Sequence, residues 1–239
     1  MSVPQLILAS GSPRRQQFLR ELGLPFVVQV ADIDETPAAA EAPIDLALRL
    51  ASSKAQAVAA RLATSKNDYI IVAADTVVAL DNQLLGKPAD AAEAIQMLTV
   101  LCDRTHEVHT SISVLCWPNG EQQTWVNTTQ VQMRNYSDAE IAAYVATGDP
   151  LDKAGAYAIQ HPDFAPVCAL QGCMSGVIGL PLGDLRALLA NVGIELTAAV
   201  VPVCCRQTHF PCCQEATTKA VHIGTQHGTR YTNHESRNP

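Results

Sequence analysis

The chain has 239 residues, of which 48% are hydrophobic and 16% are charged, enough for one large domain or two small ones with a sizeable core. Its net charge of −7 argues against binding to nucleic-acid polymers or to a membrane surface, so an anionic ligand needs a local cluster of basic groups. No apolar run reaches the roughly 20 residues of a membrane span, and residues 1–9 do not form a signal peptide, so we expect a cytoplasmic protein.

The first third of the chain alternates between strand and helix patterns. Strands are expected at residues 5–9 and 25–30, and helices at 13–22 and 44–63. A β-rich apolar run follows at residues 69–73. This interleaving favours the α/β class.

The middle of the chain predicts antiparallel pairing as well. Asp81-Asn82 is a turn signal between strands expected at residues 77–80 and 83–85. Further elements are a helix at 90–101 and long strands at 105–116 and 121–133. The sheet is therefore expected to be mixed, twisted and built from both parallel and antiparallel strands.

The last ordered part ends in helices. Ser-Asp-Ala-Glu from Ser137 is a capping box that opens a helix at 137–147, and Gly148 ends it. A short strand is expected at 177–178 and a final helix at 181–192.

The composition changes at about residue 203. The segment 203–239 is polar, lacks a hydrophobic period and contains two cysteine doublets, Cys204-Cys205 and Cys212-Cys213. Adjacent cysteines do not match the usual spacing of zinc ligands. We therefore expect one domain over residues 1–200 and a disordered Cys/His-rich tail over 203–239.

A turn rich in hydroxyls and positive charge lies between the first strand and the first helix. Ser10 and Ser12 add donors to the free N–H groups at the helix start, Pro13 suits the first helical position, and Arg14 and Arg15 carry guanidinium forks. This pattern predicts phosphate binding. The alternative is ordinary capping by Ser12 with two solvated arginines.

Acidic residues stand at two further places. Asp75 is expected to end an apolar strand, where the loops of α/β sheets bind ligands; alternatively it only caps a turn. Asp32, Asp34 and Glu35 form an acidic loop, which offers oxygen ligands to Mg²⁺ or Mn²⁺ or is simply solvated. Two lysines accompany them: Lys87 in a Gly-Lys-Pro turn and Lys54 on the long helix.

These motifs in this order resemble one known family, the Maf-like nucleoside triphosphate pyrophosphatases. The resemblance runs from about Leu6 to Gly193. It rests on Ser-Pro-Arg-Arg, Asp-Glu-Thr-Pro, Ala-Asp-Thr-Val-Val, Gly-Lys-Pro, Arg-Thr-His, Gly-Asp-Pro-Leu-Asp-Lys-Ala-Gly-Ala-Tyr-Ala-Ile-Gln and Gly-Leu-Pro-Leu.

The resemblance implies a fold of two lobes around a central cleft, like that of inosine-triphosphate pyrophosphatases. It also implies a homodimer that hydrolyses a nucleoside triphosphate to a monophosphate and pyrophosphate with a divalent metal, Mg²⁺ or Mn²⁺. The catalytic carboxylate falls on Asp75, and the metal is associated with Glu35 and Asp75. The phosphate-facing groups fall on Ser10, Arg14, Arg15, Lys54 and Lys87, and the residues tied to base preference on Arg14, Thr76 and Gln160.

The sequence leaves open the preferred base, the phosphate bond that is cleaved and whether catalysis is essential. Thr76 and Gln160 resemble the branch that prefers dTTP and UTP, but the segment after Gln160 departs from that branch, and Met174 stands where an aromatic residue is common. An alternative enzyme is a phosphohydrolase that removes the terminal phosphate. An alternative without essential catalysis is a nucleotide-binding regulator of septum formation.

Overall fold

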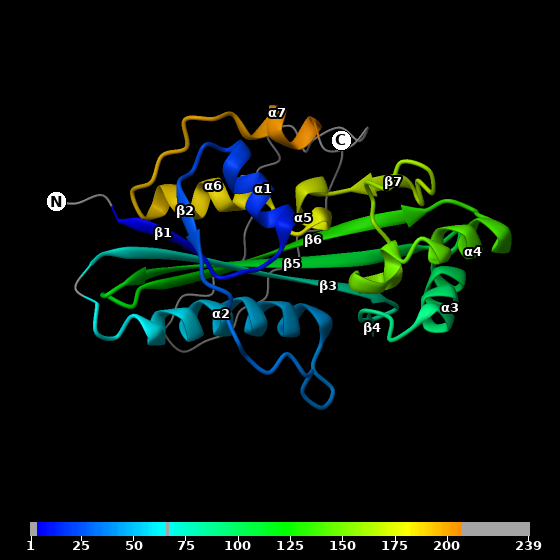
Figure 1. The fold of residues 1–239 in the computed structure, drawn as a ribbon, viewed down its shortest axis with the longest axis horizontal. Helices are drawn as coiled ribbons and strands as arrows, with labels where there is room; N and C mark the ends of the chain where they lie inside the picture. The colour runs from blue at the N-terminus through cyan, green and yellow to red at the C-terminus, as the bar shows by residue number, and fades with distance from the viewer. Residues whose placement is uncertain (1–3, 66, 207–239) are drawn as a thin grey trace, which may run out of the picture.

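The computed structural model describes residues 4–65 and 67–206 of the chain. Within these ranges the framework is a seven-stranded mixed sheet in the order β2-β1-β3-β5-β6-β7, with β4 added to the edge of β3 (Figure 1). The strands are β1 (Gln5–Leu8), β2 (Phe26–Val28), β3 (Tyr69–Leu80), β4 (Gln83–Leu85), β5 (Thr105–Trp117), β6 (Gln122–Met133) and β7 (Val167–Gln171). The pairs β1–β2 and β1–β3 are parallel and the others antiparallel, as the mixed α/β prediction requires.

Helices cover both faces of the sheet and the end of the sheet at which β4 lies (Figure 1). On one face lie α1 (Pro13–Glu21), α5 (Met174–Ile178), α6 (Leu182–Asn191) and α7 (Val200–Cys205). The long α2 (Pro43–Arg61) covers the other face, and α3 (Ala91–Leu101) and α4 (Asp138–Ala146) cover that end. Two single 3₁₀ turns, η1 (Asp149–Asp152) and η2 (Ala154–Ala156), follow α4. No helix in the described ranges is long and apolar enough to cross a membrane.

The period of two along β3 builds two apolar layers. Ile70, Val72 and Ala74 pack in the core beneath α1 and α6, whereas Ile71 and Ala73 pack in the core beneath α2. By the same alternation, the next residue, Asp75, faces α2, and Thr76 faces α1. The side chains of Asp75 and Thr76 therefore lie on opposite faces of the sheet.

The edge of β3 is open in its middle. On this edge β1 pairs with β3 up to Val72, and β4 begins to pair at Val78. The opposite edge is occupied along its length by β5, so β1 and β4 must share one side. Residues 73–77 are left between them, with Asp75 at their centre.

Two lobes meet at this opening. One contains the core under α1, α6 and α7; the other contains a separate core in which Leu98 of α3 and Tyr144 of α4 pack together. The long strands β3 and β5 contribute to both cores, which makes them the common base of the lobes. The predicted capping box at Ser137 and Glu140 is present at the start of α4.

The structure corrects several predicted elements. The strands expected at 69–73 and 77–80 are one continuous strand, β3, so Asp75 lies in the middle of a strand and not at its end. Residues 177–178 belong to the one-turn helix α5, whose start is capped by Cys173, and not to a strand. An apolar pair is too short to distinguish the two periods.

The expected boundary at residue 203 falls inside α7. Val200, Val203 and Cys204 of this helix are buried against the core under α1 and α6, so the folded unit extends at least through this helix. Composition marked the boundary too early, because the cysteine doublet that resembles the tail also supplies a buried apolar group. The rest of the expected tail, residues 207–239, lies outside the described residues.

Replacing Val203 with Ala should lower the free energy of unfolding by about 1.5 kcal/mol, because two buried methyl groups leave the core. Val201 lies on the same helix but is exposed, so Val201→Ala is the matched control and should change it by less than about 0.5 kcal/mol. Urea unfolding measures both variants. Equal effects would show that α7 does not stabilise the core.

Candidate functional site

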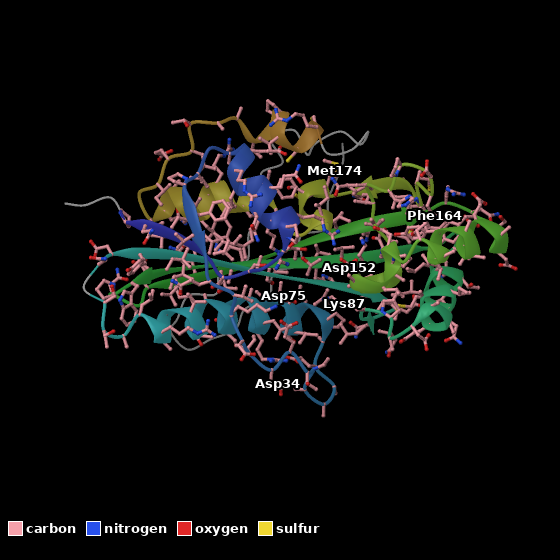
Figure 2. All side chains as sticks on the ribbon, in the orientation of Figure 1. Asp34, Asp75, Lys87, Asp152, Phe164 and Met174 are labelled. Atoms are coloured by element: carbon pink, nitrogen blue, oxygen red, sulfur yellow. The ribbon has the colours of Figure 1, made fainter. Side chains whose placement is uncertain are left out.

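A cleft of about 1010 Å³ opens between the lobes at the gap in the edge of β3. All nine residues that the family resemblance assigns to the site line it, whereas Asp32 and Asp34 of the acidic loop do not; the nine are Ser10, Arg14, Arg15, Glu35, Lys54, Asp75, Thr76, Lys87 and Gln160. Figure 2 labels three residues of this cleft, Asp75, Lys87 and Asp152, near the middle of the molecule. The fold therefore brings together residues from most of the length of the folded chain.

A buried lysine joins two acids on the α2 side of the cleft. The Lys54 Nζ atom lies 2.7 Å from Asp75 Oδ1 and 2.7 Å from Glu35 Oε1. Asp75 and Lys54 are buried, whereas the Glu35 side chain is 58% exposed at the mouth. The two carboxylates therefore face one position, which the ammonium group occupies.

Burial and charge act in opposite directions on Asp75. Burial raises the pKa of Asp75 above that of an ordinary aspartate, while the adjacent Lys54 and, more weakly, Arg15 oppose the increase. A carboxylate with a raised pKa accepts a proton more readily than an exposed one, so this environment suits a general base.

On the α1 side of the cleft, Arg15 is held in a fixed position. Its Nε donates to Gly179 O at 2.8 Å, Nη1 donates to Ser10 Oγ at 3.0 Å, and Nη2 donates to Thr76 Oγ1 at 3.2 Å. Burial lowers the pKa of Arg15, but a guanidinium stays charged at neutral pH. Arg15 therefore ties α1, α5 and β3 together where they border the cleft.

Arg14 differs from its neighbour. It lines the same cleft, but within the described ranges it makes no hydrogen bond or ion pair, so its donors are available to a ligand. Ser12 occupies the N-cap position without a side-chain capping bond. The simple reading of this turn, capping by Ser12 with two solvated arginines, therefore does not describe it: one arginine is anchored and the other is open to the cleft.

The Thr110 hydroxyl, beside Thr76 and Arg15, belongs to this site although no motif in the sequence indicated it. Thr110 on β5 is directly opposite Thr76 in the sheet register, and its Oγ1 donates to Gly176 O at 2.8 Å. It also lies 3.1 Å from Thr76 Oγ1. The only signal was its position on the neighbouring strand, which is visible once β3 and β5 are aligned.

The second lobe contributes a charged wall. Asp149, Asp152 and Lys153 line the cleft together with Lys87, and Lys153 Nζ contacts Asp149 Oδ1 at 2.9 Å and Asp152 Oδ1 at 2.6 Å. Asp149, Asp152 and Lys153 belong to the Gly-Asp-Pro-Leu-Asp-Lys motif, but the sequence indicated no role for them. A backbone bond from Gly155 N to Gly86 O, 3.0 Å long, fastens this wall to the turn that carries Lys87.

Gln160 lies farther along the same wall, in the segment 158–162, all of which lines the cleft. His161 also belongs to this segment, and its Nδ1 accepts a hydrogen bond from the Phe164 backbone at 3.0 Å. His106 lies outside the cleft, and its Nε2 is 2.7 Å from Tyr157 Oη. Met174 is buried in the core and does not line the cleft, so it forms no part of its wall.

The two carboxylates fit a divalent cation through the oxygens that are not bonded to Lys54, Glu35 Oε2 and Asp75 Oδ2. Mg²⁺ commonly binds one or two carboxylates and completes its shell with water and substrate phosphates. Within the described ranges there is no cluster of three or more His, Cys, Asp or Glu side chains suited to a metal. Glu35 and Asp75 thus offer a partial ligand set of the kind that a nucleotide phosphate completes.

Comparison with known proteins agrees with the resemblance seen in the motifs. A family model described as Maf-like protein matches residues 5–192. A protein of Myxococcus xanthus named dTTP/UTP pyrophosphatase is 47% identical over 191 residues, which cover 80% of this chain and 94% of that protein. One of Methylobacillus flagellatus with the same name is 43% identical over 196 residues, 82% of this chain and 96% of that protein.

Among solved structures, a HAM1 protein from Coxiella burnetii aligns with a TM-score of 0.43 and 19% identity, over 79% of this chain and 100% of that one. The family model covers nearly all of the folded chain, and the relatives are similar over the same extent. The chain therefore belongs to the Maf-like protein family.

Proposed function

We propose that this protein is a nucleoside triphosphate pyrophosphatase that hydrolyses dTTP and UTP to the monophosphate and pyrophosphate. The observation that carries the proposal is the convergence of Arg14, Lys54 and Lys87 with two carboxylates in one cleft. The names of the relatives that span the same length support the substrates.

The cations explain how an acidic protein holds a polyanion. Lys54 has three N–H donors, and with its ammonium between the two carboxylates a phosphate oxygen can take the third. Arg14 offers a guanidinium fork, and Lys87 adds a charge from the second lobe. We assign Arg15 and Ser10 to the support of this turn, because the Arg15 donors are already engaged there.

The chemistry needs a positioned water and a proton acceptor. Asp75 accepts the proton of the water while the water oxygen bonds to the α or the β phosphorus. The bond between that phosphorus and the oxygen that bridges α and β breaks, which gives the nucleoside monophosphate and pyrophosphate. A bound Mg²⁺ or Mn²⁺, held by Glu35 and Asp75, would neutralise charge on the phosphates.

The homodimer rests on the family resemblance, whereas the location and the absence of nucleic-acid and membrane partners rest on the charge and the apolar pattern of the sequence. We propose that the protein is cytoplasmic and acts as a homodimer on free nucleotides, without a nucleic-acid polymer or a membrane as partner. Size-exclusion chromatography with light scattering tests the dimer.

A panel of triphosphates with Mg²⁺ or Mn²⁺ tests the function. UTP and dTTP should release pyrophosphate faster than CTP, ATP or GTP, with no orthophosphate as a direct product and no turnover in EDTA. Orthophosphate as the first product would instead show removal of the terminal phosphate. Nucleotide binding without any hydrolysis would favour a regulatory protein.

Replacing Asp75 with Asn should lower kcat by about 10²–10⁴-fold, because the amide cannot accept the proton. The Kd for UTP, measured by calorimetry, should change little, since the cations that face the phosphates remain. Near-normal turnover in this variant would exclude Asp75 as the base.

Replacing Glu35 with Gln should weaken Mg²⁺ binding and raise the Mg²⁺ concentration for half-maximal rate. Asp34→Asn is the matched control: Asp34 is the neighbouring acid, lies outside the cleft lining and bonds the Thr36 N–H through Oδ1 at 2.9 Å. Direct Mn²⁺ titration followed by electron paramagnetic resonance measures both variants. Equal weakening by the two variants would contradict the assignment of Glu35.

A further inference from the structure

Tyr144 lies beside two segments of the second lobe that line the cleft, one around Asp149 and one that begins at Ala158. It belongs to α4 and is 3% exposed, with its ring stacked on Phe164 at 4.3 Å between centroids and edge-on to His161 at 4.7 Å. Its hydroxyl donates to Asp149 Oδ2 at 2.6 Å and accepts from Ala158 N at 3.1 Å. One buried hydroxyl thus bridges Asp149 and Ala158, which both line the cleft.

The first of these segments is the charged wall. Asp149 holds Lys153 through both its side chain and its carbonyl oxygen, at 2.9 and 2.5 Å from Lys153 Nζ. The second segment begins at Ala158 and carries Gln160 two residues later. The position of Gln160 in the cleft is therefore tied to the charged wall through the Tyr144 hydroxyl.

We propose that Tyr144 is a positioning residue for base selection, which fixes the segment 158–162 against the nucleotide base without touching the substrate itself. This inference rests on the proposed function, and specifically on Gln160 facing the base. It assigns to Tyr144, Asp149 and Lys153 one shared task, which is to set the distance between the Gln160 segment and the rest of the cleft.

The hydrogen bonds of the Tyr144 hydroxyl hold Asp149 and Ala158 in a fixed relative position. Burial and the hydrogen bond to Asp149 both raise the pKa of Tyr144, so the hydroxyl keeps its proton and continues to donate. A hydrogen bond to a charged acceptor in a buried place is stronger than one between neutral groups. Without the hydroxyl, the Ala158 N–H and one oxygen of Asp149 lose their partner, and the segment can shift to find new ones.

The bridge is separate from the reacting groups. Asp75, Glu35 and Lys54 meet on the α2 side of the cleft, whereas Tyr144 belongs to the core of the second lobe. A loosened segment should therefore weaken the binding and discrimination of bases more than it slows cleavage at saturating substrate.

The test compares Tyr144→Phe with Tyr136→Phe, a matched control in the same core. Tyr136 is also buried, contacts Phe164 at 5.0 Å between ring centroids and donates its hydroxyl to Leu98 O at 2.7 Å, but among the described residues it makes no hydrogen bond or ring contact with segment 158–162. Both variants keep the aromatic ring and lose one buried hydroxyl, which makes two hydrogen bonds in Tyr144 and one in Tyr136. A general loss of stability should therefore appear in both variants as a fall in Tm.

For Tyr144→Phe we expect kcat/KM for the best base of the triphosphate panel to fall about tenfold, mainly through KM, with kcat within about twofold of the wild type. The ratio of kcat/KM between the best and the poorest base should shrink by a similar factor. Tyr136→Phe should keep the wild-type ratio. An unchanged ratio in Tyr144→Phe, or an equal loss in both variants, would overturn the inference while the proposed function stands.

A second pair of variants examines the partner of the hydroxyl. Asp149→Asn keeps an oxygen that accepts from Tyr144 and should retain most of the discrimination, whereas Asp149→Leu should lose it as Tyr144→Phe does. Equal discrimination in both Asp149 variants would overturn the inference. If the wild type releases pyrophosphate from no triphosphate, the proposed function fails, and titration of UTP and ATP binding to the same variants still decides whether Tyr144 controls base preference.

Discussion

Two short strands share one edge of β3, and the part of that edge between them determines where the site lies. β1 pairs as far as Val72 and β4 starts at Val78, so the middle of a buried strand is left open to a cleft. Backbone groups elsewhere along β3 are covered by neighbouring strands. The opening places Asp75 deep in the protein and yet within reach of a ligand.

Strand alternation then divides the chemistry between two sides. Asp75 meets Lys54 and Glu35 on the side of α2, and Thr76 meets Arg15 on the side of α1. A shift of one residue in the register of β3 would exchange these partners, because each side chain would move to the opposite face. The continuity of β3 across both lobes therefore fixes the positions of the acids relative to the cations.

The adjacent arginines show how packing separates residues that look alike in a sequence. Arg15 donates to three oxygens of the protein, whereas Arg14 keeps its donors directed to the cleft without a protein partner in the described ranges. The net charge of −7 makes such local arrangement necessary, since the protein as a whole repels anions. Tyr144 has a comparable structural task in the other lobe, where its hydroxyl joins Asp149 of the charged wall to Ala158 of the segment that carries Gln160.

Local signals in the sequence were sufficient for most helices and long strands, for the capping box at Ser137, for the family and for nine of the residues that line the cleft. These features depend on periodicity, turn residues and motifs, which are properties of short segments. The one-turn α5, the edge strand β7 and the burial of α7 depend on neighbours distant in the chain, and short segments carry no record of them. The place of Asp75 within a strand, the different tasks of Arg14 and Arg15, and the bridge at Tyr144 were decided by the tertiary structure alone, because each arises from pairing or packing between residues far apart in sequence.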